Sequence, residues 1–412
     1  MSSFKRSILS YSSAMLFCRF VAIVQGLVIM RWMPPEALGP WFGLQLISVY
    51  GAHAHLGILN AVNRQIPFHR GRQELAEAEN VEQVARGAIL IMSLIGLVVV
   101  GIMAISGMLG SVYGRGVVAL TFCAVIALGV QFHLGLFRAR QQFGLAGWGN
   151  VANAVVILLG LPLVYYLRYE GLLWRISAAS LFALFVCLGM NRWDLRVRFS
   201  WSETLRLVRI GAPIMVVVLT LAAFSSMDRT LILLRLDAEA MGLYGLCFSI
   251  ARVMALVPNT IGQLFYPRMT ELYGAQGFCK GLVRRCLQAS AMSGAAAGSA
   301  AIGAVLTLPW VVNSFFPRYA DGLPALRVAM IAYTILALAA GPTYFLIATV
   351  QKRRQLVAVA LGALSMIGIA YGIAPQSLVG IAWSLVGGTV IYIGGLWMIV
   401  IASSRRAARI AA

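Results

Sequence analysis

Long apolar runs separated by short polar segments dominate the pattern along the chain. A helix that spans a membrane needs about 20 mostly apolar residues. Stretches of this kind lie at residues 11–32, 39–62, 87–107, 116–137, 146–167, 171–190, 211–235, 241–265, 289–311, 323–347, 355–373 and 378–402. The pattern predicts an all-α integral membrane protein with about 12 transmembrane helices. Because the connections are short, consecutive helices are expected to be antiparallel neighbours.

Two polar segments between the apolar runs predict structure of their own. Residues 72–86 are rich in helix formers and glutamate, which indicates a short surface helix with a solvated face or a partner contact. Residues 191–210 form the longest polar linker. Within it, Ser200 and Glu203 match a capping box, so a helix should begin near Trp201 and lie at the headgroup level as an amphipathic segment.

A short motif occurs twice, at matching points of the chain. Residues 35–41 read PEALGPW and residues 238–244 read AEAMGLY, so Glu, Ala, a large apolar residue, Gly and an aromatic residue recur 203 positions apart. The repeat predicts two pseudosymmetric six-helix bundles, 1–190 and 211–412, joined by the cytoplasmic linker 191–210. Because six is even, the bundles should be related by an axis along the membrane normal, as in some transporters.

Composition and charge support membrane insertion. The chain has 412 residues, of which 60% are hydrophobic and 11% charged, whereas a soluble domain has about 25% charged residues. The net charge of +20 raises the question of a nucleic-acid partner. However, most of the Lys and Arg residues lie in alternate connections, which is typical of cytoplasmic loops. The charge therefore predicts contact with anionic membrane lipids, no nucleic acid, and both termini in the cytoplasm.

Signals for an enzyme, a cofactor or a metal are missing from the sequence. It contains neither GxxxxGK nor HExxH, and no predicted span carries paired carboxylates. The expected outer loops are too short for a catalytic domain. The six cysteines include no CxxC pair, which favours buried thiols over a metal site or a disulfide framework. We therefore expect no catalytic residues, no cofactor and no metal, and a protein that is not an enzyme.

Ionisable residues inside the predicted spans are the candidates for function. Asp228 and Arg229 lie side by side within the apolar stretch 211–236, where a central charge costs about 2.5–3.5 kcal/mol. Arg19 lies in the first span and Arg252 in the eighth. If the two bundles face each other through these spans, three arginines and one acid line the space between them. Such a cavity suits an anionic ligand such as a phosphate or pyrophosphate, because guanidinium matches phosphate oxygens.

Alternative interpretations of these residues stay open. Asp228 either gates or couples transport, or it pairs with an arginine and joins two helices. Arg19 and Arg252 either line a water-filled cavity, or they pack against neighbouring helices or extend their charged ends to the membrane surface. His53 and His55, two positions apart in a predicted helix, should point to different faces and cannot bind one metal together. They are either packing histidines or participants in proton coupling.

Short motifs along the whole chain resemble one family of membrane proteins. They are Lys5-Arg6, Glu36-Ala37-Leu38-Gly39, Leu56-Gly57-Ile58, Asn63-Arg64, Pro67, Asp228-Arg229, Glu239-Ala240-Met241-Gly242-Leu243-Tyr244 and Tyr266-Pro267. Their order and spacing, together with the twelve spans, resemble the polysaccharide-transporter branch of the multidrug/oligosaccharidyl-lipid/polysaccharide (MOP) flippase superfamily. The case rests on this order, because no single motif is specific.

The resemblance implies a flippase of the bacterial inner membrane. By alternating access, it would move undecaprenyl-pyrophosphate-linked oligosaccharide repeat units to the outer leaflet for O-antigen (lipopolysaccharide), exopolysaccharide or capsule synthesis. A polysaccharide polymerase and other assembly proteins would be its partners. The residues expected to bind the substrate are Arg19, Arg229 and Arg252. The residues expected to gate or couple transport are Asp228, His53 and His55.

Two other function classes stay open at this stage. A multidrug antiporter of the same fold would take organic cations and should have an acidic or aromatic cavity, whereas the expected cavity is cationic. A membrane glycosyltransferase or polymerase would act on the same lipid-linked sugars. The short outer loops and the single acid well inside a span, Asp228, argue against that second class.

Overall fold

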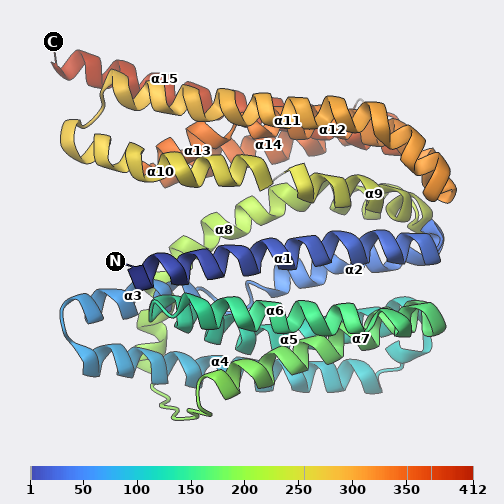
Figure 1. Ribbon diagram of the computed structural model, residues 1–412, viewed down its shortest axis with the longest axis horizontal. Coiled ribbons are helices and arrows are strands. Elements are labelled where there is room, and N and C mark those ends of the chain that lie inside the picture. Colours follow the sequence, from blue (N-terminus) through green and yellow to red (C-terminus); the bar gives the residue numbers. More distant parts are fainter. Residues whose placement is uncertain (1, 255, 350, 373, 412) are drawn as a thin grey trace. The chain divides into compact units, whose positions relative to one another are not determined.

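The computed structural model describes residues 2–254, 256–349, 351–372 and 374–411. It describes side chains from Ser13 on, except at 248, 251–253, 256–257, 259–260, 262–264, 267, 274, 352 and 406–411. All regular structure in these residues is helical (Figure 1). Among them, nine helices are long and apolar enough to cross a membrane. The chain is therefore an all-helical, multi-pass membrane protein, as predicted.

The helices form two compact units. The first unit comprises Met1–Met33 and Pro40–Leu219, and the second comprises Pro34–Gly39 and Thr220–Ala412. Helix α8 (Trp201–Arg235) continues without interruption through the boundary at Thr220. The sequence-based division into two pseudosymmetric bundles joined at 191–210 stays a prediction.

Six helices lie wholly in the first unit. They are α1 (Ser2–Trp32), α3 (Ile58–Gly71), α4 (Leu75–Ile105), α5 (Val112–Ala139), α6 (Phe143–Leu159) and α7 (Leu161–Met190). Helix α1 packs along α6, and α5 lies beside α4 and α7 (Figure 1). The core is formed by one face of α3, with Ile58, Val62 and Ile66 at a spacing of four, against Phe132 and Leu136 of α5.

Seven further α-helices of the described residues lie wholly in the second unit. They are α9 (Ala238–Met254), α10 (Leu256–Gln276), α11 (Lys280–Phe315), α12 (Leu323–Ala337), α13 (Ala340–Ala348), α14 (Lys352–Gly372) and α15 (Leu378–Ala411). Helix α14 packs along α15, and α10 lies beside α11 and α13 (Figure 1). Phe345 and Leu396 are fully buried in the core of this unit.

The predicted second span, 39–62, is two helices and not one. Helix α2 runs over Pro35–Gly51, a turn follows, and α3 begins at Ile58. Gly57 has a φ of 89°, a conformation that favours glycine. A Cβ atom on Gly57 would lie 2.4 Å from the backbone nitrogen of Ala212, so the turn permits a close approach to α8. The predicted spans 241–265 and 323–347 likewise correspond to α9 with α10 and α12 with α13.

The boundary predicted between the fifth and sixth spans lies inside α7. Helix α6 ends at Leu159 and α7 begins at Leu161, so the chain breaks earlier than expected. Arg168, at the predicted boundary, interrupts α7 with φ 53° and ψ −121°. Its Nη1 donates a 2.7 Å hydrogen bond to the carbonyl of Trp32. The last carbonyl groups of a helix have no partner within the helix. This bond provides a partner for the carbonyl of Trp32 at the end of α1.

The polar segments have mixed outcomes. The separate surface helix predicted for 72–86 is wrong, because α4 begins at Leu75 and continues unbroken into the apolar run. The solvent exposure predicted for the glutamates of this segment is also wrong at Glu82, whose side chain is buried. The predicted helix start is confirmed: α8 begins at Trp201, and the Ser200 hydroxyl accepts a 3.4 Å hydrogen bond from the backbone N–H of Glu203, which is one of the two bonds of a capping box.

Candidate functional site

The carboxylate of Asp228 joins three helices of the second unit. Asp228 lies in α8 and is 2% exposed. Its Oδ2 accepts hydrogen bonds from the hydroxyls of Tyr244 in α9, at 2.7 Å, and Tyr333 in α12, at 3.4 Å. Its Oδ1 accepts a 2.8 Å hydrogen bond from the backbone N–H of Arg229. These donors offset part of the cost of burying a carboxylate.

A cavity lies beside this carboxylate site, in the same unit. Its volume is about 240 Å³, and its lining includes Tyr333, Tyr344, Tyr392, Thr343 and Pro258. Tyr333 therefore touches both the cavity and Asp228. Hydroxyl groups that donate and accept hydrogen bonds can pass a proton or hold a polar ligand. No sequence pattern pointed to Tyr333, whereas Tyr244 belongs to the repeated motif.

The three candidate arginines have different surroundings. Arg229 is buried in α8, at 3% exposure, within the second unit. Arg19 lies on α1 in the first unit and its side chain is exposed. Arg252 belongs to α9, but its side chain lies outside the described residues. The expected grouping of these arginines around one anion stays a prediction.

His53 and His55 lie in the turn between α2 and α3 and not within a helix. The expectation that they point to different helix faces is wrong, because it assumed one continuous helix. His53 Nδ1 lies 3.0 Å from the carbonyl of Val49, and His55 Nδ1 accepts a 3.0 Å hydrogen bond from Gly57 N–H. Both imidazoles therefore hold the local backbone, and their role in coupling stays a prediction.

The two copies of the repeated motif touch each other through their glycines. A Cβ atom on Gly39, in α2, would lie 1.8 Å from the carbonyl oxygen of Ala238. A Cβ atom on Gly242, in α9, would lie 1.9 Å from the carbonyl oxygen of Pro35. Pro35 matches Ala238 in the repeat, and Gly39 matches Gly242, so the two contacts are equivalent. We call this reciprocal backbone contact the glycine junction.

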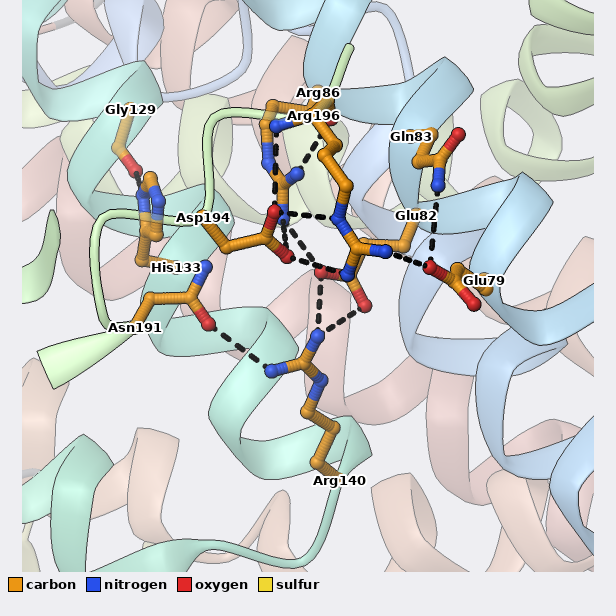
Figure 2. A network of polar contacts seen from close by, with 10 residues as sticks. All are labelled: Glu79, Glu82, Gln83, Arg86, Gly129, His133, Arg140, Asn191, Asp194 and Arg196. Carbon is orange, nitrogen blue, oxygen red and sulfur yellow. Dashed lines mark hydrogen bonds and ion pairs between the residues drawn. The ribbon is translucent and has the colours of Figure 1, made fainter. Parts of the chain in front are cut away.

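A charged network holds the linker on the first unit (Figure 2). At its centre, buried Glu82 of α4 accepts hydrogen bonds from Arg86, at 2.6 Å, and from Arg140 at the end of α5, at 2.5 Å. Arg140 also donates to Asn191, and Arg86 donates to the carbonyl of Arg196. The linker is thus tied to both α4 and α5. The sequence analysis missed this network, although the Glu82-x-x-x-Arg86 spacing was a signal.

Replacing Glu82 with glutamine is expected to destabilise the protein by about 3 kcal/mol, because buried Arg86 and half-buried Arg140 lose the carboxylate that lies between them. The midpoint of thermal unfolding in detergent measures this loss. Glu79→Gln is the matched control, since Glu79 pairs with Arg196 on an exposed surface and should change the midpoint little. Equal midpoints for the two variants would contradict a central role for Glu82.

The pH dependence of the linker follows from Asp194. Hydrogen bonds from the Arg196 side chain lower the pKa of Asp194 to about 2, and the charges of Arg86 and Arg196 add to the effect. Because this pKa is depressed in the folded state, the ionised Asp194 stabilises the folded protein at pH values above its unfolded pKa of about 3.9. This stabilisation is lost as the pH falls toward 2. Protease resistance of residues 191–200 should therefore be constant from pH 8 to 5. A loss of resistance within that range would contradict the assignment.

Comparisons with known proteins agree with this architecture. The family described as polysaccharide biosynthesis protein matches residues 4–273. No curated protein matches the chain. Three similar solved structures are an inward-facing MATE family multidrug resistance transporter of the MOP superfamily, the lipid II flippase MurJ in an inward closed conformation, and a MOP superfamily transporter from Pyrococcus furiosus described with a binding pocket of reverse polarity.

The likeness to these structures extends along the whole chain. The MATE transporter has a TM-score of 0.77 at 17% identity, covering 97% of this chain and 99% of that one. MurJ has a TM-score of 0.70 at 10% identity, covering 95% and 87%, and the Pyrococcus furiosus protein 0.63 at 18%, covering 97% and 96%. Identities this low show a shared fold. The fold is that of MOP superfamily transporters, which agrees with the predicted fold class. By its match over residues 4–273, the chain belongs to the polysaccharide biosynthesis protein family.

Proposed function

We propose that this chain is a flippase for undecaprenyl-pyrophosphate-linked oligosaccharide repeat units. It would move them across the bacterial inner membrane for O-antigen, exopolysaccharide or capsule synthesis, with both chain termini in the cytoplasm. The observation that carries the proposal is a polysaccharide-biosynthesis family match on a transporter fold. The similar structure of MurJ is described as a lipid II flippase, so this fold also occurs in a protein that moves a lipid-linked sugar.

Arginine side chains are proposed to bind the pyrophosphate group of the substrate. Arg19, Arg229 and Arg252 are basic residues within helices of an apolar membrane protein. A charge within the hydrocarbon region is costly, and a doubly ionised pyrophosphate would offset part of that cost for several arginines at once. Guanidinium groups bind such oxygens through paired hydrogen bonds.

Asp228 is proposed to couple transport to an ion gradient. Its carboxylate is buried, and Tyr333 connects it to a cavity that could admit water or an ion. A carboxylate at such a place can exchange a proton or hold a monovalent cation, and it links this exchange to the positions of α8, α9 and α12. His53 and His55 are retained as further candidates for coupling.

The glycine junction is proposed to open and close during the transport cycle. Backbones that meet without side chains between them can separate without repacking a core. Alternating access requires contacts that can open and close on either side of a central site.

A multidrug cation antiporter is the second candidate, because the MATE transporter shares the fold over nearly the full chain. The excess of arginine over acid in the predicted site disfavours a cationic substrate. The Pyrococcus furiosus structure is described with a pocket of reverse polarity and a suggested different function, so pocket charge differs within this fold.

Charge reversal in cells tests the proposal. In a host that lacks its own flippase, the wild-type chain should restore surface polysaccharide, and Arg19→Glu with Arg252→Glu should abolish this at normal protein levels. Arg209→Glu is the control, because Arg209 is exposed and lies outside the proposed site. Drug resistance conferred on a sensitised host, without restored polysaccharide, would support the antiporter instead.

A further inference from the structure

An apolar groove of about 390 Å³ lies between α14 and α15 in the second unit. The lining from α14 consists of Arg354, Val357, Ala358 and Leu361. These positions follow the i, i+3, i+4, i+7 spacing, so they form one face of the helix. The face extends over two turns, which is about 10 Å.

The opposite wall of the groove is a matching face of α15. Gly395, Met398, Ile399 and Ala402 follow the same spacing. The small Gly395 and Ala402 leave the groove open, while Met398, at 67% exposure, and Val357, at 59% exposure, form its apolar rims. Two helix faces of this kind form a groove, open on one side and about 10 Å long, which fits part of one extended hydrocarbon chain.

One end of the groove carries a fixed cation. Arg354 Nη1 donates hydrogen bonds to Gln351 Oε1, at 2.9 Å, and to Ser403 Oγ, at 3.3 Å. The Ser403 hydroxyl in turn donates to Gln351 Oε1 at 3.0 Å. Both bonds of Arg354 use the same nitrogen, and in the described part of the chain they leave Nε and Nη2 available for an anion. The guanidinium is therefore held in place at the mouth of the groove.

The surroundings of this end are uniformly basic. Arg353 and Arg405 are exposed next to Arg354 and Ser403 along their helices. Residues 322–412 contain no aspartate or glutamate. Among the described residues, no ion pair engages Arg353, Arg354 or Arg405. The arrangement thus combines an apolar channel with positive charge at one end, which complements an anionic lipid.

We propose that this groove binds one acyl chain of an anionic phospholipid from the surrounding bilayer, with the lipid phosphate at Arg354. The apolar walls hold the acyl chain by direct contact and separate it from the mobile lipid of the bilayer. Arg354 contributes charge-assisted hydrogen bonds, and Arg353 and Arg405 add attraction at the headgroup level. The site is independent of the transported substrate.

Native mass spectrometry of the full-length protein in detergent tests the proposal. Phosphatidylglycerol should bind more tightly than phosphatidylcholine with the same acyl chains. Arg354→Gln should weaken phosphatidylglycerol binding about tenfold, which corresponds to the loss of a charge-assisted hydrogen bond. Arg209→Gln, which removes the same charge from an exposed site in the first unit, is the control and should leave binding unchanged.

A second measurement, photo-cross-linking, locates the bound acyl chain directly. Phosphatidylglycerol with a photoreactive group in its acyl chain should cross-link the wild-type protein at residues 354–361 and 395–402. Ala402→Phe, which fills the groove, should remove these cross-links. Cross-links elsewhere, equal binding of the two phospholipids, or equal effects of Arg354→Gln and Arg209→Gln would each overturn the proposal. Cross-linking by a photoreactive polyprenyl phosphate but not by phosphatidylglycerol would assign the groove to the substrate tail and would also overturn it.

Discussion

Replacing Asp228 with asparagine is expected to reduce gradient-driven transport more than tenfold while leaving the protein folded. Asparagine has nearly the same shape and can still accept hydrogen bonds from Tyr244 and Tyr333. It cannot bind and release a proton, and it carries no charge that could hold a cation. Transport should be measured in proteoliposomes with and without an imposed ion gradient.

Two further variants define the role of this carboxylate. Asp321→Asn removes the same charge from an exposed position of the second unit and should leave transport unchanged. Tyr333→Phe keeps the charge of Asp228 but removes its hydroxyl contact beside the cavity, so it should weaken the gradient dependence in part. Normal gradient dependence in Asp228→Asn would show that this residue joins helices and does not couple transport.

Alanine at either glycine of the junction is expected to reduce transport more than tenfold. The added Cβ atom would lie 1.8 Å from a carbonyl oxygen for Gly39 and 1.9 Å for Gly242, and the obstacle in both cases is backbone. Overpacking of a tight contact typically costs about 1–3 kcal/mol, and about 1.4 kcal/mol corresponds to a tenfold change in an equilibrium. The closed form of the junction should therefore be depopulated.

Gly394→Ala is the matched control for the junction variants. Gly394 lies in α15, and a Cβ atom there would meet no atom within 4 Å among the described residues. Alanine in an unobstructed helix should leave stability equal or slightly higher. Because the two contacts are equivalent by the repeat, Gly39→Ala and Gly242→Ala should have similar effects. Transport by both variants at the rate of Gly394→Ala would contradict the junction.

The helices with long apolar runs could be predicted from hydropathy alone. Helices α4, α5, α8, α11 and α15 contain runs of sufficient length, and burial in a bilayer requires each run to satisfy its own backbone as a helix. The break in the second span could not be predicted in this way. The break contains Gly57, which lies close to Ala212 of α8, and a hydropathy profile contains no information about such a contact.

The extension of α4 into the polar segment was not predicted from the sequence, for a different reason. The polar residues before Gly87 have good helix propensity and no proline, so the local sequence allows the membrane helix to continue. Glu82 was expected to face solvent because it is charged. Glu82 is buried beside Arg140, and its partner Arg86 also pairs with Asp194 of the linker, contacts that form only in the folded chain.

The candidate site was predicted in part. The cost of a charge in an apolar helix identified Asp228, and the repeat identified the segment that contains Tyr244. The contribution of Tyr333 depends on how α12 packs against α9, which residue patterns do not specify. The expected placement of His53 and His55 on different faces of a helix was wrong because it depended on an unbroken second helix, whereas their role in coupling stays a prediction.

Flipping by the purified protein tests the central claim most directly. The protein would be reconstituted with labelled undecaprenyl-pyrophosphate oligosaccharide, and a membrane-impermeant glycosidase would report label that reaches the outer leaflet of the vesicles. We expect movement above that of protein-free vesicles, and its loss when Arg19 and Arg252 are both replaced by glutamate. Movement that persists in that variant would reject the arginine site alone. No movement with several glycans, with and without proton or sodium gradients, would contradict the proposed flippase.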